Sequence, residues 1–238
     1  MIFAAGKGTR LMPLTETLPK ALVKIKGITL LEHVIQHLKK YHVEEIIINI
    51  HYLAEQITEF LEASQYFGLS VHFSDERDLL LDTGGGLKKA AGFFGKNEDF
   101  IAYNVDILSD IDLNSMMTKH KESGNLATLA VRSRKTSRYF LFDNEMQLCG
   151  WENTHTSQRI LSRKTPHNLT SYAFSGIHII NASIFDLIHE TGVFSMTQVY
   201  TNLCKNSQIK GFVHNDSQWY DIGKHDSIIE AEKYYKFI

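Results

Sequence analysis

An uninterrupted run of large apolar residues restricts the fold of this chain most strongly. Residues 45–50 read EIIINI, and their side chains do not alternate between apolar and polar. A strand with one face in water alternates, whereas a strand covered on both faces does not. The run therefore predicts a strand inside a parallel sheet, with helices packed on the two faces of that sheet.

Helical and extended patterns alternate on both sides of this run. Apolar spacing predicts helices over residues 29–41, 54–63, 87–93, 113–123, 184–189, 196–206 and 226–235. Strands are predicted over residues 1–4, 45–50, 70–73, 100–104, 126–131, 171–180, 210–214 and 218–222, with a break at Ser175-Gly176. Short alternations between residues 132 and 164 indicate a small antiparallel hairpin region. The pattern predicts an α/β fold, Rossmann-like, with a mostly parallel mixed sheet flanked by helices.

Composition narrows the class of protein. The chain has 238 residues, 43% of them hydrophobic and 22% charged, with a net charge of −2. There is no global basic field, so a nucleic-acid partner is not expected. We find no internal repeat and no boundary between independent domains, which predicts a single domain over residues 1–238.

The cellular setting is also an expectation from the sequence. Met1 leads directly into a predicted strand, and no apolar run is long enough to span a bilayer. We therefore expect a cytoplasmic protein with no membrane partner. Cys149 and Cys204 match no disulfide framework or zinc motif, and we expect both to be reduced and structural.

Three unusual stretches fall at the ends of predicted strands, at residues 5–10, 75–86 and 104–106. Ligands of parallel sheets bind beyond the carboxyl ends of the strands. Gly6 and Gly8 would let backbone N–H groups approach an anion, and Arg10 and Lys20 would add positive charge. The stretch fits neither the P-loop nor the dinucleotide fingerprint. A bare glycine pair is also common in ordinary turns, so only the longer pattern around it can distinguish a phosphate-binding loop from a turn.

That longer pattern, G-K-G-T-R-L-x-P-L-T-x-x-x-P-K from Gly6 to Lys20, resembles the signature of the sugar nucleotidyltransferases, also called nucleoside-diphosphate-sugar pyrophosphorylases. Four more segments resemble motifs of that family, so the resemblance covers essentially the whole chain. They are PKALV at 19–23, DTGGG at 82–86, NVD at 104–106 and WYDIG at 219–223. The triple glycine and FSGI at 174–177 look most like the single-domain N-acetylmuramate-1-phosphate uridylyltransferases, and mannose-1-phosphate guanylyltransferases are similar.

The resemblance implies the nucleotide-diphospho-sugar transferase fold and a Mg²⁺-dependent reaction. In it, a sugar 1-phosphate attacks the α-phosphate of a nucleoside triphosphate (NTP) and pyrophosphate leaves. UTP with N-acetylmuramate 1-phosphate is the first choice of substrates, and GTP with mannose 1-phosphate is the alternative. From another class, an inactive regulatory subunit that binds nucleotide sugars remains open. Residues 1–131 would mainly bind the nucleotide, residues 132–181 the sugar, and residues 182–238 would supply the second metal aspartate and the closing helix.

The same resemblance assigns roles to individual residues. Arg10 and Lys20 would be catalytic, and Asp106 and Asp221 would hold Mg²⁺ through oxygen ligands. The expected nucleotide-binding residues are Ala4, Ala5, Gly6, Lys7, Gly8, Thr9, Thr83, Gly84 and Gly85. The expected sugar-binding residues are Ser175, Gly176 and Glu152.

Each assignment has a plainer alternative. Lys20 alone reads as a solvated surface lysine, and Asp106 alone reads as a turn residue after a strand. The triple glycine could be a helix start that binds nothing. The chain also departs from the family pattern, because Val105 stands where a glycine usually precedes the first aspartate.

Overall fold

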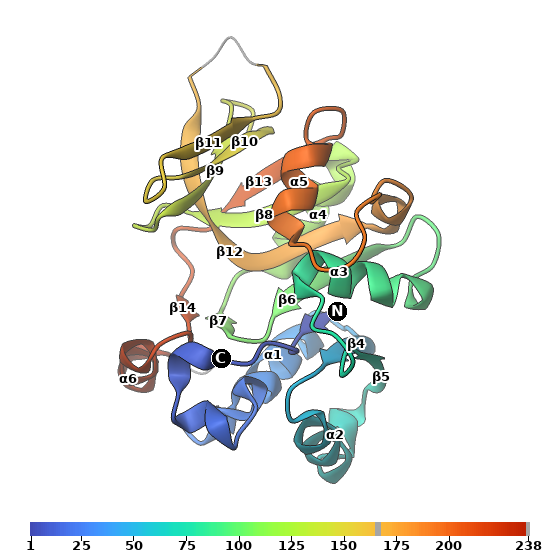
Figure 1. Cartoon of the computed structure of the whole chain (residues 1–238), viewed down its shortest axis with the longest axis vertical. Helices are drawn as coiled ribbons and strands as arrows, with labels where there is room; N and C mark the ends of the chain where they lie inside the picture. The colour runs from blue at the N-terminus through green and yellow to red at the C-terminus, as the bar shows by residue number, and fades with distance from the viewer. Residues whose placement is uncertain (165–167, 237–238) are drawn as a thin grey trace. The chain divides into compact units, whose positions relative to one another are not determined.

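The computed structural model describes residues 1–164 and 168–236, and their contacts fall into two compact units (Figure 1). The first unit contains residues 1–82, 103–111 and the segment from residue 217 onward. The second contains residues 83–102 and 112–216. Each unit therefore consists of segments that are not consecutive in the sequence. The predicted division of the chain into three consecutive functional segments does not include this arrangement. The expected single domain and its three functional segments stay predictions.

Parallel strands form the centre of the first unit. Its sheet contains β1 (Ile2–Phe3), β4 (Glu45–Ile50), β5 (Ser70–Asp75) and the last residues of β6 (Asp99–Asn104). Ile2 pairs in parallel with Ile48 on one side and with Tyr103 on the other, and β5 pairs with β4 along six residues. Every residue of β4 except Glu45 is buried, which confirms the strand predicted to be covered on both faces. Helices α1 (Leu30–Lys39) and α2 (Ala54–Ala63) complete this α/β arrangement.

The first unit also contains several short elements. They are the 3₁₀ turns at Thr9–Leu11, Leu14–Glu16 and Lys20–Leu22, the hairpin of β2 (Lys24–Ile25) and β3 (Ile28–Thr29), the strand pair of β7 (Ile107–Ser109) and β14 (Trp219–Asp221), and the helix α6 (His225–Tyr234). A buried cluster joins several of these elements, with Leu11, Ile25, Leu108 and Ile222 at 0–1% exposure. Elements of the opening stretch and of the end of the chain thus share one hydrophobic core.

The second unit contains the antiparallel region. Its strands are β8 (Ala127–Arg132), β9 (Arg138–Phe142), β10 (Leu148–Asn153), β11 (Gln158–Leu161), β12 (Thr170–Asn181) and β13 (Ile209–Val213). β9, β10 and β11 form successive antiparallel pairs, β12 pairs with both β8 and β9, and β13 runs parallel to β8. Helices α3 (Asp82–Lys89), α4 (Leu113–Ser123) and α5 (Met196–Leu203) join them. The hairpins predicted between residues 132 and 164 are confirmed.

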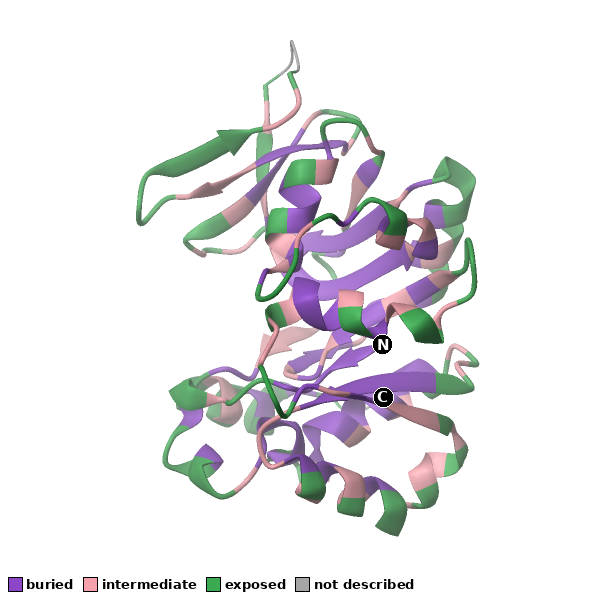
Figure 2. Cartoon of the chain, turned by 45° about the vertical axis from the view of Figure 1, so that its right-hand side comes forward, coloured by how far each residue is buried: buried purple, intermediate pink, exposed green. Residues whose placement is uncertain are grey.

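Local sequence explains where several helices begin. The side chains of Thr29, Asp112 and Ser195 each accept a hydrogen bond from a backbone N–H in the first turn of α1, α4 and α5. Such caps satisfy N–H groups that have no partner inside the helix. Gly124 ends α4 with φ 57°, a left-handed conformation that glycine adopts easily. Figure 2 shows the inner strands in the buried colour and the outward faces of helices in the exposed colour.

The structure corrects several predicted bounds. Helix α3 begins at Asp82, five residues before the predicted start, because the glycine run is helical. β12 is one strand, and the predicted break at Ser175-Gly176 is a bulge at which the register with β8 shifts and Gly176 adopts φ 77°. The helix predicted over residues 184–189 is a 3₁₀ turn at Ala182–Asp186. The mixed sheet with flanking helices confirms the predicted α/β class. Across the residues described, no helix has the length and apolar character needed to cross a membrane.

Candidate active site

The opening stretch is an exposed loop that leaves the buried strand β1. Ala4 and Ala5 are 3% and 4% exposed, whereas Gly6, Lys7, Thr9 and Arg10 are exposed. No atom lies within 4 Å of the position that a Cβ on Gly6 would take. The loop therefore presents its small residues and two cations to solvent, as a phosphate-binding loop requires.

A buried threonine closes this loop. The hydroxyl of Thr15 donates to the carbonyl of Gly8 at 2.8 Å, and the N–H of Leu11 donates to the same oxygen at 2.8 Å. Gly8 has φ 66°, and a Cβ there would lie 3.0 Å from Thr15 Cγ2 and 3.1 Å from Lys20 Cβ. Gly8 is thus required both for its left-handed backbone and for the close approach of Thr15 and Lys20.

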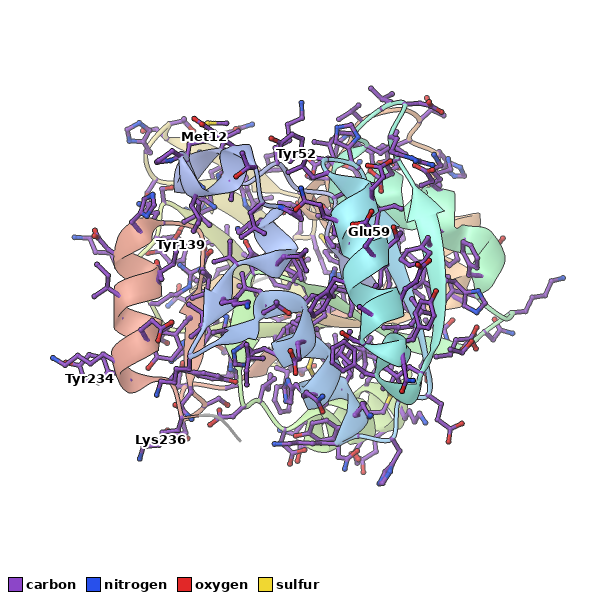
Figure 3. All side chains as sticks on the ribbon, turned by 90° about the horizontal axis from the view of Figure 1, so that it is seen from below. Met12, Tyr52, Glu59, Tyr139, Tyr234 and Lys236 are labelled. Atoms are coloured by element: carbon purple, nitrogen blue, oxygen red, sulfur yellow. The ribbon has the colours of Figure 1, made fainter. Side chains whose placement is uncertain are left out.

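The same loop segment contacts helix α2 at its start. The hydroxyl of Tyr52 donates to the carbonyl of Glu16 at 2.7 Å, and Gln56 Nε2 donates to the carbonyl of Thr17 at 3.0 Å. Figure 3 labels both Tyr52 and Met12. The side chain of Met12 points away from the ribbon, and this residue is 48% exposed. The loop is therefore tied down on one side while its tip stays in solvent.

Lys20 is a buried site residue, not a surface lysine. It is 8% exposed, and its ammonium group donates a hydrogen bond to Asp106 Oδ2 in a salt bridge. The two residues are 86 positions apart in the sequence. The carboxylate side chain keeps 21% exposure, so one side of it remains accessible. A lysine and an aspartate from separate motifs thus meet in the first unit, which the surface and turn readings do not explain.

The strand pair β7–β14 brings the two predicted metal aspartates to neighbouring positions. Asp221 pairs with Ile107 in the antiparallel register, and the N–H of Ile222 donates to the carbonyl of Asp106 at 2.8 Å. Asp106 lies in the turn directly before β7, and Asp221 is the last residue of β14. Asp106 and Asp221, which are more than a hundred positions apart in the sequence, are therefore neighbours across the β7–β14 pair, because Asp221 pairs with the residue that follows Asp106.

The side chain of Arg10 lies beside Asp221, next to Gly223. A Cβ on Gly223 would lie 2.7 Å from Arg10 Nη2 and 2.8 Å from Asp221 Oδ1. No side chain fits there without moving both groups, so Gly223 makes room for the guanidinium beside the carboxylate. The first unit consequently gathers Arg10, Lys20, Asp106 and Asp221 around the opening loop.

The donor set suits a magnesium ion better than a transition metal. Among residues 1–164 and 168–236, no group of three or more His, Cys, Asp or Glu side chains could hold a metal by itself. Mg²⁺ is bound by one or two carboxylates together with water and substrate phosphates, so two aspartates fit it. Val105, the departure from the family pattern, is 4% exposed and packs inside the first unit.

The triple glycine has a packing role in the second unit. The N–H groups of Gly84 and Gly85 donate to the carbonyl of Phe194 at 2.9 and 3.1 Å. A Cβ on Gly84 would lie 2.5 Å from the Phe194 ring and 2.8 Å from its carbonyl oxygen. The hydroxyl of Thr83 accepts from the N–H of Met196 at 3.0 Å. These three predicted nucleotide-binding residues therefore contact Phe194 or Met196, at the start of α5, and their role toward a nucleotide stays a prediction.

The predicted sugar-binding residues lie elsewhere in the second unit. Ser175 is fully buried at the β12 bulge, and its hydroxyl hydrogen-bonds to His214 Nε2 at 2.7 Å. Glu152 on β10 accepts from the hydroxyl of Ser171 at 2.8 Å. Gly176 supplies the positive φ of the bulge. The structure places all three on β10 and β12, and their role toward a sugar stays a prediction.

Burial sets the protonation of several side chains outside these groups. Burial lowers the pKa of His178 to about 3, and Nδ1 of this histidine hydrogen-bonds to the hydroxyl of Tyr200 at 2.5 Å. Burial also lowers the pKa of His37 to about 4, against a smaller opposing effect of the hydrogen bond to the Ile111 carbonyl. Burial raises the pKa of Cys204 to about 11. Cys149 and Cys204 are both free and buried.

Three residues that matter for the geometry were not predicted. Thr15 is fully buried beside Gly8, Asn49 is 3% exposed on β4, and Glu76 is fully buried after β5. Asn49 left a signal, because it is the one polar residue among the buried positions of EIIINI. Glu76 left no such signal, since it stands in a charged stretch that is typical of a protein surface.

A pocket of about 490 Å³ lies in the second unit, lined by Asp99, His120 and Asn181 among others. Its lining contains none of the predicted site residues.

Sequence comparison with characterised proteins finds relatives over nearly the whole chain. An N-acetylmuramate α-1-phosphate uridylyltransferase of Caulobacter vibrioides is 28% identical over 98% of this chain and 94% of its own length. A UTP–glucose-1-phosphate uridylyltransferase of Synechocystis is 27% identical, and a mannose-1-phosphate guanyltransferase of Gibberella zeae is 28% identical, each over 94% of this chain. The chain spans only 60% of the length of these last two proteins.

Solved structures share the fold. HddC from Yersinia pseudotuberculosis, solved in complex with GMP-PN, superposes with a TM-score of 0.78 at 22% identity, covering 99% of this chain and 98% of its own. A UDP-glucose pyrophosphorylase from Acinetobacter baumanii superposes with a TM-score of 0.76 at 19% identity, covering 97% and 90%. The family model described as nucleotidyl transferase matches residues 1–236. The chain therefore belongs to the nucleotidyl transferase family, among the sugar nucleotidyltransferases that its motifs resemble.

Proposed function

We propose that this protein catalyses Mg²⁺-dependent transfer of a nucleotidyl group to a sugar 1-phosphate, with UTP and N-acetylmuramate 1-phosphate as substrates. The observation that carries the proposal is the grouping of Arg10, Lys20, Asp106 and Asp221 around one exposed glycine loop. Two cations and two carboxylates, brought from four sequence segments, suit a reaction in which anionic phosphates must be held together. We expect the reaction to take place in the cytoplasm.

The chemistry needs positioning more than proton transfer. The attacking oxygen belongs to a phosphate monoester with a second pKa of about 6, so it is largely ionised at neutral pH. In the proposed reaction, Gly6 and Gly8 leave room for the triphosphate, and Arg10 neutralises the departing β- and γ-phosphates. Lys20 would sit near the α-phosphate and the incoming sugar phosphate. Alignment of two reactants and neutralisation of their charge together supply the rate enhancement.

The carboxylates have a separate task in this proposal. Asp106 and Asp221 would hold Mg²⁺, which when bound offsets the negative charge that develops on the phosphate oxygens. Lys20 already donates to one oxygen of Asp106, and that contact fixes the orientation of the carboxylate. Gly223 leaves room for Asp221 beside Arg10, because a Cβ at this position would lie within 3 Å of both side chains.

The choice of substrates rests on two motifs. The triple glycine at 84–86 and FSGI at 174–177 look most like the N-acetylmuramate-1-phosphate uridylyltransferases. The enzymes of that name from Caulobacter vibrioides and Neisseria meningitidis are 28% and 26% identical, each over 98% of this chain. A guanylyltransferase acting on GTP and mannose 1-phosphate is the second candidate, favoured by 28% identity to the Gibberella zeae enzyme.

The test is a pyrophosphate-release assay that crosses UTP, GTP, CTP and dTTP with several sugar 1-phosphates in the presence of Mg²⁺. We expect the highest kcat/KM for UTP with N-acetylmuramate 1-phosphate, and no turnover after removal of divalent cations with EDTA. A preference for GTP with mannose 1-phosphate would establish the second candidate. Silence with every pair would refute the enzyme and favour the regulatory nucleotide-sugar-binding subunit.

A further inference from the structure

Glu76 is a fully buried carboxylate that is not among the predicted site residues. It follows β5 and has 0% exposure. Its Oε1 accepts from Asn49 Nδ2 at 2.7 Å, and its Oε2 accepts from the N–H of Leu81 at 3.0 Å. An ionised carboxylate has only acceptors to offer, and each of these oxygens faces a donor. The side chain is therefore held at both oxygens.

Asn49 extends this contact to the opening stretch. Its Oδ1 accepts from the N–H of Ala4 at 2.7 Å, and Asn49 itself is 3% exposed on β4. The result is one continuous series of hydrogen bonds through side chains, which we call the Asn49–Glu76 link. It joins the N–H of Ala4 to the N–H of Leu81. Ala4 is the first residue after β1, and Leu81 directly precedes the first residue of α3, Asp82.

The backbone around Glu76 limits how far the link can move. The N–H of Glu76 donates to the carbonyl of Ile50 at 2.8 Å, and the carbonyl of Glu76 hydrogen-bonds to His51 Nδ1 at 2.7 Å. Main chain and side chain of Glu76 are thus both bound to the end of β4 and its neighbours. A buried polar group held at each atom is costly to disturb, because a freed donor or acceptor has no water to replace its partner.

We propose that Asn49 and Glu76 are positioning residues for nucleotide binding. The Asn49–Glu76 link sets the spacing between the opening loop at Ala4 and the segment that ends at Leu81, directly before Asp82. This inference rests on the proposed function, because it assigns both segments to the nucleotide. It adds that the affinity for the nucleotide depends on two residues that do not touch it.

The direction of the hydrogen bonds makes the proposal testable. The N–H groups of Ala4 and Leu81 are both donors, so residues 49 and 76 together must present an acceptor at each end. Asn49 with Glu76 does so, with the amide N–H₂ donating to the carboxylate. Glu76→Gln alone leaves two amides between two donors, and one hydrogen bond must break in any orientation. Asn49→Asp alone brings two carboxylates face to face.

The double substitution restores every contact. In Asn49→Asp/Glu76→Gln, one oxygen of residue 49 accepts from Ala4, and its other oxygen accepts from the new amide at residue 76. The carbonyl oxygen of that amide accepts from Leu81. The two single changes are therefore predicted to be harmful and their combination to be compensating, which is the signature of a direct coupling.

The experiment measures the dissociation constants for UTP and GTP by titration calorimetry in Mg²⁺, together with kcat and the KM for each substrate. For the preferred nucleotide we expect each single variant to weaken binding by about tenfold or more, since a lost buried hydrogen bond costs roughly 1–3 kcal/mol. The KM for the sugar 1-phosphate should stay within about twofold. The double variant should return to within about threefold of the wild type.

Ser74→Ala is the matched control. Ser74 is 4% exposed on β5, and its hydroxyl lies outside the link. The control should leave the nucleotide dissociation constant unchanged. Single variants that lower only the fraction of folded protein, with unchanged dissociation constants, would show a purely structural role and overturn the proposal. A double variant no better than the singles would overturn it as well.

Failure of this inference differs from failure of the proposed function. Nucleotide affinity is measured without turnover, so a wild type that binds UTP or GTP but releases no pyrophosphate refutes the enzyme alone. Hydrogen exchange at the amides of Ala4 and Leu81 adds a readout without substrate. Both amides should exchange faster in each single variant and return to the wild-type rate in the double variant. Unchanged exchange in the single variants would refute the link itself.

Discussion

The two glycine-rich stretches look alike in the sequence and differ in the structure. In the first unit, Gly6 is exposed, with no atom within 4 Å of a Cβ placed on it. In the second unit, Gly84 and Gly85 are buried, and their N–H groups are already bound to the carbonyl of Phe194. One stretch keeps its backbone open to solvent, and the other uses its missing side chains for close packing.

The difference teaches that glycines in two motifs, both predicted to bind a nucleotide, can serve two separate structural needs. An open loop needs glycine so that an anion can approach the backbone. A helix start packed against another segment needs glycine because a Cβ would collide with that segment. The open stretch also has charged side chains beside it, because Lys20 and Asp106 form a salt bridge in the first unit. Five variants test this contrast.

The largest effect is expected where charge gathers beside the open stretch. Lys20→Met and Asp106→Asn should each lower kcat by about 10²–10³-fold. The first removes a cation that faces the transferring phosphates, and the second removes a carboxylate proposed to hold Mg²⁺. Pyrophosphate release in Mg²⁺ measures the loss, and circular dichroism checks the fold. Lys88→Met is the control, since Lys88 donates to the carbonyl of Glu190 in the second unit. Rates near those of the wild type in Asp106→Asn would contradict the assignment.

Gly84→Ala should act on stability. The added Cβ would lie 2.5 Å from the Phe194 ring and 2.8 Å from its carbonyl oxygen, so α3 or the Phe194 segment must shift. Overpacking of this kind lowers the free energy of unfolding by about 1–3 kcal/mol. Urea denaturation measures it, with Gly92→Ala as the control because nothing lies within 4 Å of that position. Equal stability of the two variants would show that the packing role is wrong.

Gly6→Ala should show the opposite behaviour. The position is open and its φ is not positive, so the free energy of unfolding should change by less than about 0.5 kcal/mol. The added methyl group would crowd the approach of the triphosphate, and we expect the KM for the nucleotide to rise about tenfold, or about 1.4 kcal/mol. An unchanged KM in steady-state kinetics would remove Gly6 from the nucleotide site.

Thr83→Val should give the smallest effect. It removes the hydroxyl that accepts from the N–H of Met196, and a single hydrogen bond of this kind contributes about 1 kcal/mol to stability. Thr83→Ser keeps the hydroxyl and serves as the control. Thermal unfolding compares the two variants. If Thr83→Val instead weakened nucleotide binding at constant stability, the hydroxyl of Thr83 would bind the nucleotide. The DTGGG stretch would then have a binding role as well as a packing role.

Elements with strong local patterns were predictable from the sequence. The strand at Glu45–Ile50 and the helices at Ala54–Ala63 and Leu113–Ser123 have the predicted bounds, because burial on both faces or on one helical face leaves a direct trace in residue order. Helix α3 was predicted five residues short, because three consecutive glycines weaken any helix signal. Tertiary contact with Phe194 overrides that weak propensity.

The candidate site was predictable only where a motif marks it. Arg10, Lys20, Asp106 and Asp221 were assigned through the family resemblance, whereas the pairing of Lys20 with Asp106 spans 86 residues and leaves no local trace. The short strands β7 and β14, which align the two aspartates, have three residues each. Glu76 could not be predicted, since its burial depends on donors from β4 and from the segment before α3.

The ion pair between Lys20 and Asp106 also makes the two signs of charge at this site interdependent. An anion that attracts the ammonium group of Lys20 leaves the carboxylate of Asp106 freer to accept a cation. A cation at Asp106 in turn leaves Lys20 freer to meet an anion. Because coupling free energies are reciprocal, each kind of ion should strengthen the binding of the other by the same factor. A single salt bridge would then make the first unit respond to anion and cation together and only weakly to either one alone.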